Sequence, residues 1–219
     1  SPGSRDGDGS NFTSGVIQFG AGDGPAALTI NGVAVTEEGQ EIELATGTFY
    51  IIAINPDSIE YFFWLTDNTI GDNVSQLITV GITDLDGDTV SASFEIDIID
   101  DVPEAVADFD SIPAGTFGPA TGNVITDAEN DGGRDFPGAD GATVSSVSGS
   151  GDPVAAGTPV AGLYGVLTLN SNGSYSYVRN PGTPGGVFDT FTYRLTDGDG
   201  DTATATLRIA IGDGGVTID

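Results

Sequence analysis

The residues best suited to chemistry in this chain are aspartates in short turns that contain glycine. The segment TDLDGD at 83–88 places Asp84, Asp86 and Asp88 on alternate positions beside one glycine. Such a turn can direct three carboxylates toward one centre, because glycine permits a tight backbone. Ca²⁺ takes about six to eight oxygen ligands in flexible geometry, whereas Mg²⁺ keeps more water. The pattern therefore predicts calcium sites with carboxylate ligands.

Two known calcium-binding motifs do not fit this turn. An EF-hand that starts at Asp84 would need glycine at its sixth position, where Thr89 stands, and a helix where the chain alternates like a strand. The calcium-binding nonapeptide repeat GGxGxDxUx is absent. A solvated turn rich in aspartate and glycine stays open as an alternative to a metal site. The recurrence of the turn, described next, favours the metal site.

The aspartate turn occurs twice. The segment TDGDGD at 196–201 repeats it, and Asp197 follows Asp84 at an offset of 113 residues (197 − 84 = 113). The same offset relates Asp213 to Asp100, which is an internal repeat with a period near one domain. Pro103 breaks the strand before it. We therefore predict two domains, 11–101 and 102–219, after a tag or linker at 1–10.

Period-two alternation dominates the elements that must position these turns. Residues 89–98 and 202–211 alternate between apolar and polar side chains, which is typical of strands with one face buried. Residues 165–178 predict a hairpin with NSNG as its turn, and no segment has a helical period. Short strands, glycine-rich turns and about 100 residues per unit predict an all-β chain of two tandem immunoglobulin-like β-sandwich domains joined end to end.

The composition limits the partners and cofactors of the chain. It has 33 acidic residues, five arginines and no Lys, His, Cys or Met, and its formal net charge is −28. Nucleic acid and anionic membranes need a cationic surface, and no apolar stretch is long enough for direct membrane insertion, so neither is an expected partner. Disulfides are excluded, and structural zinc is disfavoured. Bound Ca²⁺ would relieve the charge repulsion. The absence of Met indicates a segment of a larger protein.

Strand length separates the aspartates into two groups. A strand over 89–99 spans roughly 35 Å, so the turn at 84–88 cannot share an ion with Asp100. In a sandwich, the exit strand of one domain should reach the end where the next domain presents its last hairpin turn. We therefore predict Ca²⁺ between the two domains, with the 84–88 turn facing a preceding domain and Asp213 a following one. The predicted metal ligands are Asp84, Asp86, Asp88, Asp100, Asp101, Asp127, Asp131, Asp135, Asp140, Asp197, Asp199, Asp201 and Asp213.

An enzyme and a carbohydrate-binding module are the two alternative functions. An enzyme without His, Cys or Lys would need a carboxylate pair, as in glycoside hydrolysis, but the acids lie in strand-end turns, so no catalytic residues are expected. A carbohydrate-binding module would use Phe62 and Trp64 in EYFFWL at 60–65 as a surface for stacking on sugars. The favoured interpretation is that Trp64 or its alternate residues fill the core.

The quoted segments resemble the tandem repeats of giant bacterial RTX adhesins secreted by the type I system. TDLDGDTVSASFEIDIIDDVP at 83–103 is similar to a type I secretion target repeat, and this resemblance covers about 74–103 of the first domain. In the second domain, GNVITD, GADGATVSSV, YGVLTLNSNGSYSYV and DTFTYRLTDGDGDTATATLRIAI resemble VCBS or Bap-like repeats over nearly its whole length.

The resemblance implies an extracellular location on the bacterial surface and Ig-like extender domains that Ca²⁺ stiffens at their junctions. Its implied partners are neighbouring repeats of the same adhesin, with host-cell or surface glycan or protein ligands bound through other domains. The implied role is cell adhesion and biofilm formation. In some members an extender is split and carries an inserted ligand-binding module, and the weaker match over 11–70 leaves that arrangement open here.

Overall fold

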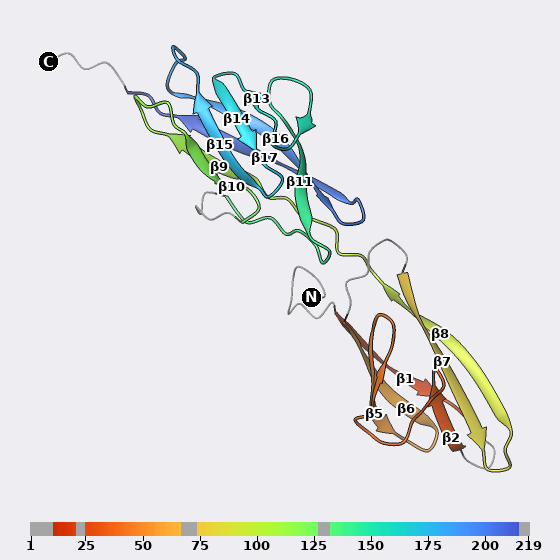
Figure 1. Ribbon diagram of the computed structural model, residues 1–219. Helices are drawn as coiled ribbons and strands as arrows, with labels where there is room; N and C mark the ends of the chain where they lie inside the picture. Colours follow the sequence, from red (N-terminus) through yellow and green to blue (C-terminus); the bar gives the residue numbers. More distant parts are fainter. Residues whose placement is uncertain (1–10, 21–24, 67–73, 127–131, 215–219) are drawn as a thin grey trace. The chain divides into compact units, whose positions relative to one another are not determined.

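The computed structural model describes residues 11–20, 25–66, 74–126 and 132–214 (Figure 1). The regular structure within these ranges is entirely β, as predicted, and they contain no helix able to cross a membrane. Contacts between Cα atoms divide the chain into two compact units, Ser1–Asp101 and Val102–Asp219. Each unit has two sheets and its own apolar core, so the prediction of two β-sandwich domains is confirmed.

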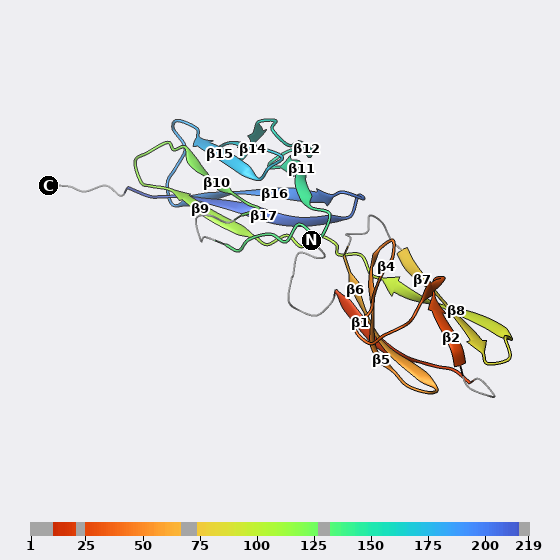
Figure 2. The same ribbon diagram turned by 60° about the horizontal axis from the view of Figure 1, so that its bottom comes forward.

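The first unit packs two four-stranded sheets against each other (Figure 2). Their strand orders are β1-β6-β5-β4 and β3-β2-β7-β8. Ile30, Phe49, Ile59 and Ile78 are completely buried between the sheets, and burial of such side chains is the main force that holds a sandwich together. The strands are β1 (Phe12–Gln18), β2 (Pro25–Ile30), β3 (Val33–Ala34), β4 (Glu41–Glu43), β5 (Gly47–Ile54), β6 (Ser58–Leu65), β7 (Val74–Asp84) and β8 (Thr89–Ile98).

The second unit packs a four-stranded sheet, β10-β15-β14-β13, against a five-stranded sheet, β12-β11-β16-β17-β9. Its pairings are antiparallel except that of β9 with β17, which is parallel. Leu167, Tyr177, Phe191 and Leu207 are completely buried in its core. The strands are β9 (Asp108–Ile112), β10 (Ala120–Asn123), β11 (Ala142–Ser148), β12 (Val154–Ala155), β13 (Val160–Ala161), β14 (Gly165–Leu169), β15 (Ser174–Arg179), β16 (Val187–Asp197) and β17 (Thr202–Ile211).

The internal repeat corresponds to one hairpin built twice. The hairpins β7–β8 and β16–β17 have the same strand lengths and the same offset of 113 residues (187 − 74 = 113). Their last paired residues before the turn also correspond, Thr83 with Thr89 and Thr196 with Thr202. Each turn therefore holds its aspartates at the tip of a long, regular ladder.

Sequence alternation predicts the buried face correctly along β17 but only in part along β8. Along β17, Leu207, Ile209 and Ile211 are buried and Arg208 is exposed, as predicted. The predicted hairpin at 165–178 is also present as β14 and β15. Along β8, however, Val90 and its neighbours as far as Ser93 are all exposed, and burial begins only at Phe94. The half of β8 nearest the turn therefore has no buried face.

The segment at 60–65 shows which of its alternating side chains fill the core. Tyr61, Phe63 and Leu65 pack into the core of the first unit, as expected of the alternate residues. Trp64 is 39% exposed and points to the opposite face of β6 with Phe62. Strand alternation requires this outcome, since adjacent side chains cannot both face the core.

Candidate metal centre

The turn at 84–88 closes the β7–β8 hairpin around one carboxylate. Oδ1 of Asp84 accepts hydrogen bonds from the backbone N–H groups of Gly87, at 3.1 Å, and Asp88, at 2.9 Å. Gly87 has φ +97°, a conformation that other residues rarely adopt. Carboxylate oxygens of Asp84, Asp86 and Asp88 lie within 4.8 Å of one another. Two oxygens bound to one Ca²⁺ are at most about 5 Å apart, so this spacing suits calcium.

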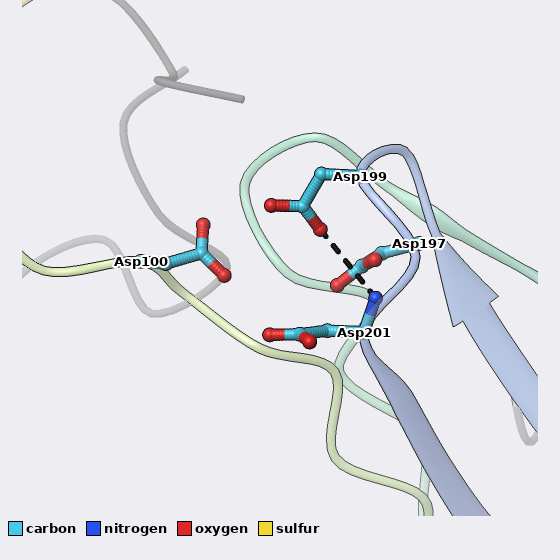
Figure 3. Close-up of side chains that lie close together, drawn as sticks. All are labelled: Asp100, Asp197, Asp199 and Asp201. Carbon is cyan, nitrogen blue, oxygen red and sulfur yellow. Dashed lines mark hydrogen bonds between the residues drawn. The ribbon is translucent and has the colours of Figure 1, made fainter. Parts of the chain in front are cut away.

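The turn of β16–β17 repeats this arrangement in the second unit. Oδ1 of Asp197 accepts a hydrogen bond from the N–H of Gly200 at 3.0 Å, and Gly200 has φ +112°. The N–H of Asp201 donates to Oδ1 of Asp199 at 3.5 Å. Figure 3 shows the carboxylates of Asp197, Asp199 and Asp201 on this one turn, and their oxygens lie within 4.8 Å of one another.

Asp140 adds a fourth carboxylate to the second turn. It precedes β11, and a Cβ atom placed on Gly198 would lie 2.5 Å from its Oδ2, so the carboxylate rests against the turn backbone. Oδ2 of Asp140 and Oδ2 of Asp197 are both buried and have no hydrogen-bond partner. Buried polar atoms are normally paired, so unpaired anionic oxygens beside further carboxylates are consistent with a site for a cation.

The two turns differ in electrostatics because the carboxylate of Asp197 is more deeply buried than that of Asp84 and lies beside the extra carboxylate of Asp140. The pKa of Asp84 is lowered, first by hydrogen bonding with Asp86 and further by backbone N–H groups of the turn. The pKa of Asp197 is raised, mainly because burial disfavours its charge, and further by Asp199 and the charge of Asp140. A bound cation would reverse this penalty by favouring the ionised form. The second turn therefore has more to gain from a metal ion.

Asp135 lies in different surroundings from these turns. It is completely buried, and Oδ1 accepts a hydrogen bond from the N–H of Val106 at 2.7 Å. The hydroxyl of Tyr193 lies 3.0 Å from Oδ2 of Asp135 and 3.0 Å from Oδ2 of the buried Asp108. Burial raises the pKa of Asp135 to about 6, although the bonds from Val106 and Tyr193 act in the opposite direction.

Several acceptors surround the one hydroxyl group of Tyr193. The single hydroxyl proton of Tyr193 faces two carboxylates and the carbonyl of Val106, which is 2.9 Å away. Asp108 and Tyr193 were not singled out from the sequence. No motif includes Asp108. The one available signal was its position as the first residue of β9, a strand whose first and last residues are buried.

The remaining predicted ligands have varied positions. Asp100 and Asp101 are half-buried at the end of the first unit, and Asp213 is exposed after β17. Asp127 and Asp131 lie outside the described residues. A site that Asp100 or Asp101 shares with the second unit depends on how the two units are placed, and it stays a prediction.

A protein-family comparison matches residues 100–213 to the bacterial cadherin-like domain, which is slightly more than half of the chain. This chain belongs to the bacterial cadherin-like domain family. Cadherin-like domains are non-catalytic, and the bacterial ones are typically found on secreted or surface proteins. The acidic cluster at the β16–β17 turn is consistent with the Ca²⁺ sites of such domains. No curated protein matches the cadherin-like chain at a significant level.

Several solved structures of β domains align with this cadherin-like chain at low similarity. A protocadherin GammaB4 extracellular domain is 13% identical, with a TM-score of 0.33, and the match covers 93% of this chain and 34% of that one. The endo-fucoidan hydrolase MfFcnA9 is 15% identical, with a TM-score of 0.30, and the match covers 92% of this chain and 31% of that one. The sialic acid binding region of a Streptococcus Sanguinis SK1 adhesin is 8% identical, with a TM-score of 0.29, and the match covers 93% of this chain and 74% of that one. Likenesses at this level carry no functional information.

Proposed function

We propose that this chain is a calcium-stabilised extracellular extender segment of a large bacterial surface adhesin. The observation that carries the proposal is the cluster at the β16–β17 turn, where Asp140 and Asp197 bury oxygens that have no hydrogen-bond partner. Three carboxylates of the turn lie close enough to share an ion, and the domain belongs to a bacterial cadherin-like family. A spacer role needs no catalytic group, which agrees with a chain devoid of His, Cys and Lys.

Calcium would be held by Asp197, Asp199 and Asp201, with Asp140 beside them. Hard oxygen ligands and a turn that tolerates irregular geometry favour Ca²⁺ over Mg²⁺. A site with three or four carboxylates and partial exposure is expected to bind in the range of about 10⁻⁴ to 10⁻³ M, which is typical of extracellular modules. Bound calcium would offset the repulsion among these carboxylates and stabilise the native state.

The proposed junction uses carboxylates from two successive domains. Asp100 and Asp101 end the first unit and would complete the coordination begun by the β16–β17 turn. The equivalent turn at 84–88 would meet a preceding domain, and Asp213 a following one. Repetition of the same turn supports this proposal, because identical hairpins in successive domains would present identical half-sites. The partners would then be neighbouring repeats of the same protein.

The finer assignment follows the resemblance to RTX adhesins. Secretion by the type I system, a place in a giant adhesin, and a role in biofilm formation belong to this proposal. A stiff extender would hold a terminal adhesive domain away from the cell. Ligands of that terminal domain would be glycans or proteins of a host cell or another surface.

Small-angle X-ray scattering with and without Ca²⁺ tests the extender role. We expect millimolar Ca²⁺ to give a more elongated, less flexible particle than EGTA does. The double variant Asp100→Ala/Asp101→Ala should lose this change while both units stay folded. The double variant Asp86→Asn/Asp88→Asn alters the net charge by the same amount. It should keep the calcium-dependent change in scattering, because the 84–88 turn would face a preceding domain and not the proposed junction between the two units. Identical scattering of the wild type in Ca²⁺ and EGTA would rule out calcium-dependent stiffening.

A further inference from the structure

We propose that the outer face of the sheet β1-β6-β5-β4 is a binding platform for neutral carbohydrate. The face carries an aromatic patch, defined as Phe12, Tyr50, Phe62 and Trp64. This site goes beyond the extender function, which needs no ligand on the side of a domain. The solvent-facing side of an antiparallel sheet usually carries polar side chains, so a cluster of four aromatic rings on this face requires an explanation.

Strand pairing places the aromatic patch on one face. Phe12 pairs with Trp64, and Tyr50 pairs with Phe62. Cross-strand partners point to the same side of a sheet, and residues two apart along one strand do so too. Phe62 and Trp64 therefore share their face with Phe12 on β1 and Tyr50 on β5. The residues that alternate with them on β6, such as Phe63, point into the core.

The rings contact one another, and Phe12 and Trp64 are exposed while Tyr50 and Phe62 are half-buried. The centroids of Phe12 and Phe62 are 5.0 Å apart with planes 26° from parallel, and those of Phe62 and Trp64 are 5.9 Å apart. Phe12 is 46% exposed and Trp64 is 39% exposed. Mutual contact fixes the rings before any ligand arrives, which lowers the entropy cost of binding. A preorganised aromatic surface is thus available on a rigid sheet.

Carboxylates flank the aromatic patch along the same strands. Glu41 pairs with Tyr50, Glu43 pairs with Thr48, which is the partner of Trp64 on β5, and Glu60 lies two residues before Phe62 on β6. All three glutamates are exposed. A sugar fits this combination because its C–H groups carry partial positive charge that the negative face of an aromatic ring attracts. Its hydroxyl groups can donate charge-assisted hydrogen bonds to the carboxylates.

Charge argues against the other occupants of such a face. Residues 11–101 contain no Lys, Arg or His, so a second copy that docked through its own first unit would bring carboxylates against carboxylates. A sulfated or otherwise anionic glycan would be repelled in the same way. A cationic peptide would be attracted, but acidic side chains occur over the whole unit and do not single out this face. The aromatic rings are what distinguish it, and they favour a neutral sugar.

Trp64 is the only tryptophan of the chain, so its fluorescence reports this site directly. Titrating the full chain with neutral cello-, laminari-, malto- and chito-oligosaccharides should give a saturable change with at least one series. Calorimetry should reproduce the affinity. Phe62→Ala should weaken binding by about tenfold or more, which is the loss expected for one stacking contact and its buried area. Trp64→Leu, measured by calorimetry, keeps an apolar side chain but loses the ring and should weaken binding similarly.

Leu77→Ala is the matched control, because Leu77 is 49% exposed on β7 of the opposite sheet. It should bind as the wild type does. Phe12→Leu provides a second, milder variant if Phe62→Ala fails to fold, and circular dichroism checks the fold of each. The proposal is overturned if none of the oligosaccharides binds, if only an oligolysine probe binds, or if Phe62→Ala merely abolishes self-association. Equal weakening by Leu77→Ala would also overturn it.

Discussion

Replacing Asp135 with asparagine should make the stability of the second unit less dependent on pH. Asp135 is buried between Val106 and Tyr193, and its pKa is raised from 3.8 to about 6. A carboxyl whose pKa is raised by folding contributes stability that is fully present below the unfolded value. That contribution is lost as the pH rises through about 6, since the folded state then has to carry a buried charge.

The size of this effect follows from the two pKa values. The difference between about 6 and 3.8 corresponds to about 3 kcal/mol between strongly acidic and neutral solution. Roughly 1.4 kcal/mol of it falls between about pH 5 and pH 7.5. Asparagine has the shape of the protonated acid, and its amide nitrogen can donate to the hydroxyl oxygen of Tyr193. That hydroxyl is then free to donate to Asp108 or to the carbonyl of Val106.

Urea unfolding in EGTA at several pH values measures the effect. Tyrosine signals report mainly the second unit, because four of the six tyrosines lie there, and the fluorescence of Trp64 reports the first unit separately. Between about pH 5 and pH 7.5, the free energy of unfolding of the wild type should fall by about 1.4 kcal/mol more than that of Asp135→Asn. Asp152→Asn removes the same charge from an exposed site and should keep the wild-type slope. Equal pH slopes for wild type and Asp135→Asn would refute the assignment of a raised pKa to this carboxyl.

Two further predictions concern buried carboxylates of the second unit. In EGTA, Asp140→Asn should leave the melting temperature unchanged or raise it, because the variant removes repulsion from Asp197. In Ca²⁺, the variant should be stabilised less by calcium than the wild type is. If thermal melts show the full calcium response, Asp140 is excluded as a ligand. Asp189→Ala should cost about 3 kcal/mol or more, because buried Asp189 accepts hydrogen bonds from the N–H groups of Leu163 and Tyr164 and from Tyr177. Tyr177→Phe should cost about 1 kcal/mol in the same urea experiment, and similar costs for both variants would contradict a central role for the carboxylate.

The fold could be predicted from the sequence because its signals are local. The repeated turn, the alternation of β17 and the NSNG hairpin each depend on residues that are close in the chain. Alternation also predicts that one side of 60–65 faces out, but it cannot say which side. The registers that bring Phe12 and Tyr50 beside Phe62 join distant segments, and these registers were not predictable from local pattern.

The candidate site was predictable only in part for the same reason. Glycine and aspartate spacing identified both turns, because the turn backbone brings those carboxylates together by itself. The distinction between Asp140 and Asp135 depends on tertiary packing. One rests against the backbone of Gly198, and the other is buried beneath Tyr193. Nothing in the local sequence around 126–141 separates these two environments.

A thermal melt in EGTA and in about 10 mM Ca²⁺ shows whether calcium stabilises this chain. With dissociation constants of about 10⁻⁴ to 10⁻³ M, each site should contribute about 1.4 to 2.7 kcal/mol by mass action. For a unit of this size, that raises the melting temperature by roughly 5 to 15 °C. The triple variant Asp197→Asn/Asp199→Asn/Asp201→Asn should lose most of the increase in the second unit. Identical melting temperatures of the wild type in EGTA and Ca²⁺ would contradict a calcium-stabilised extender.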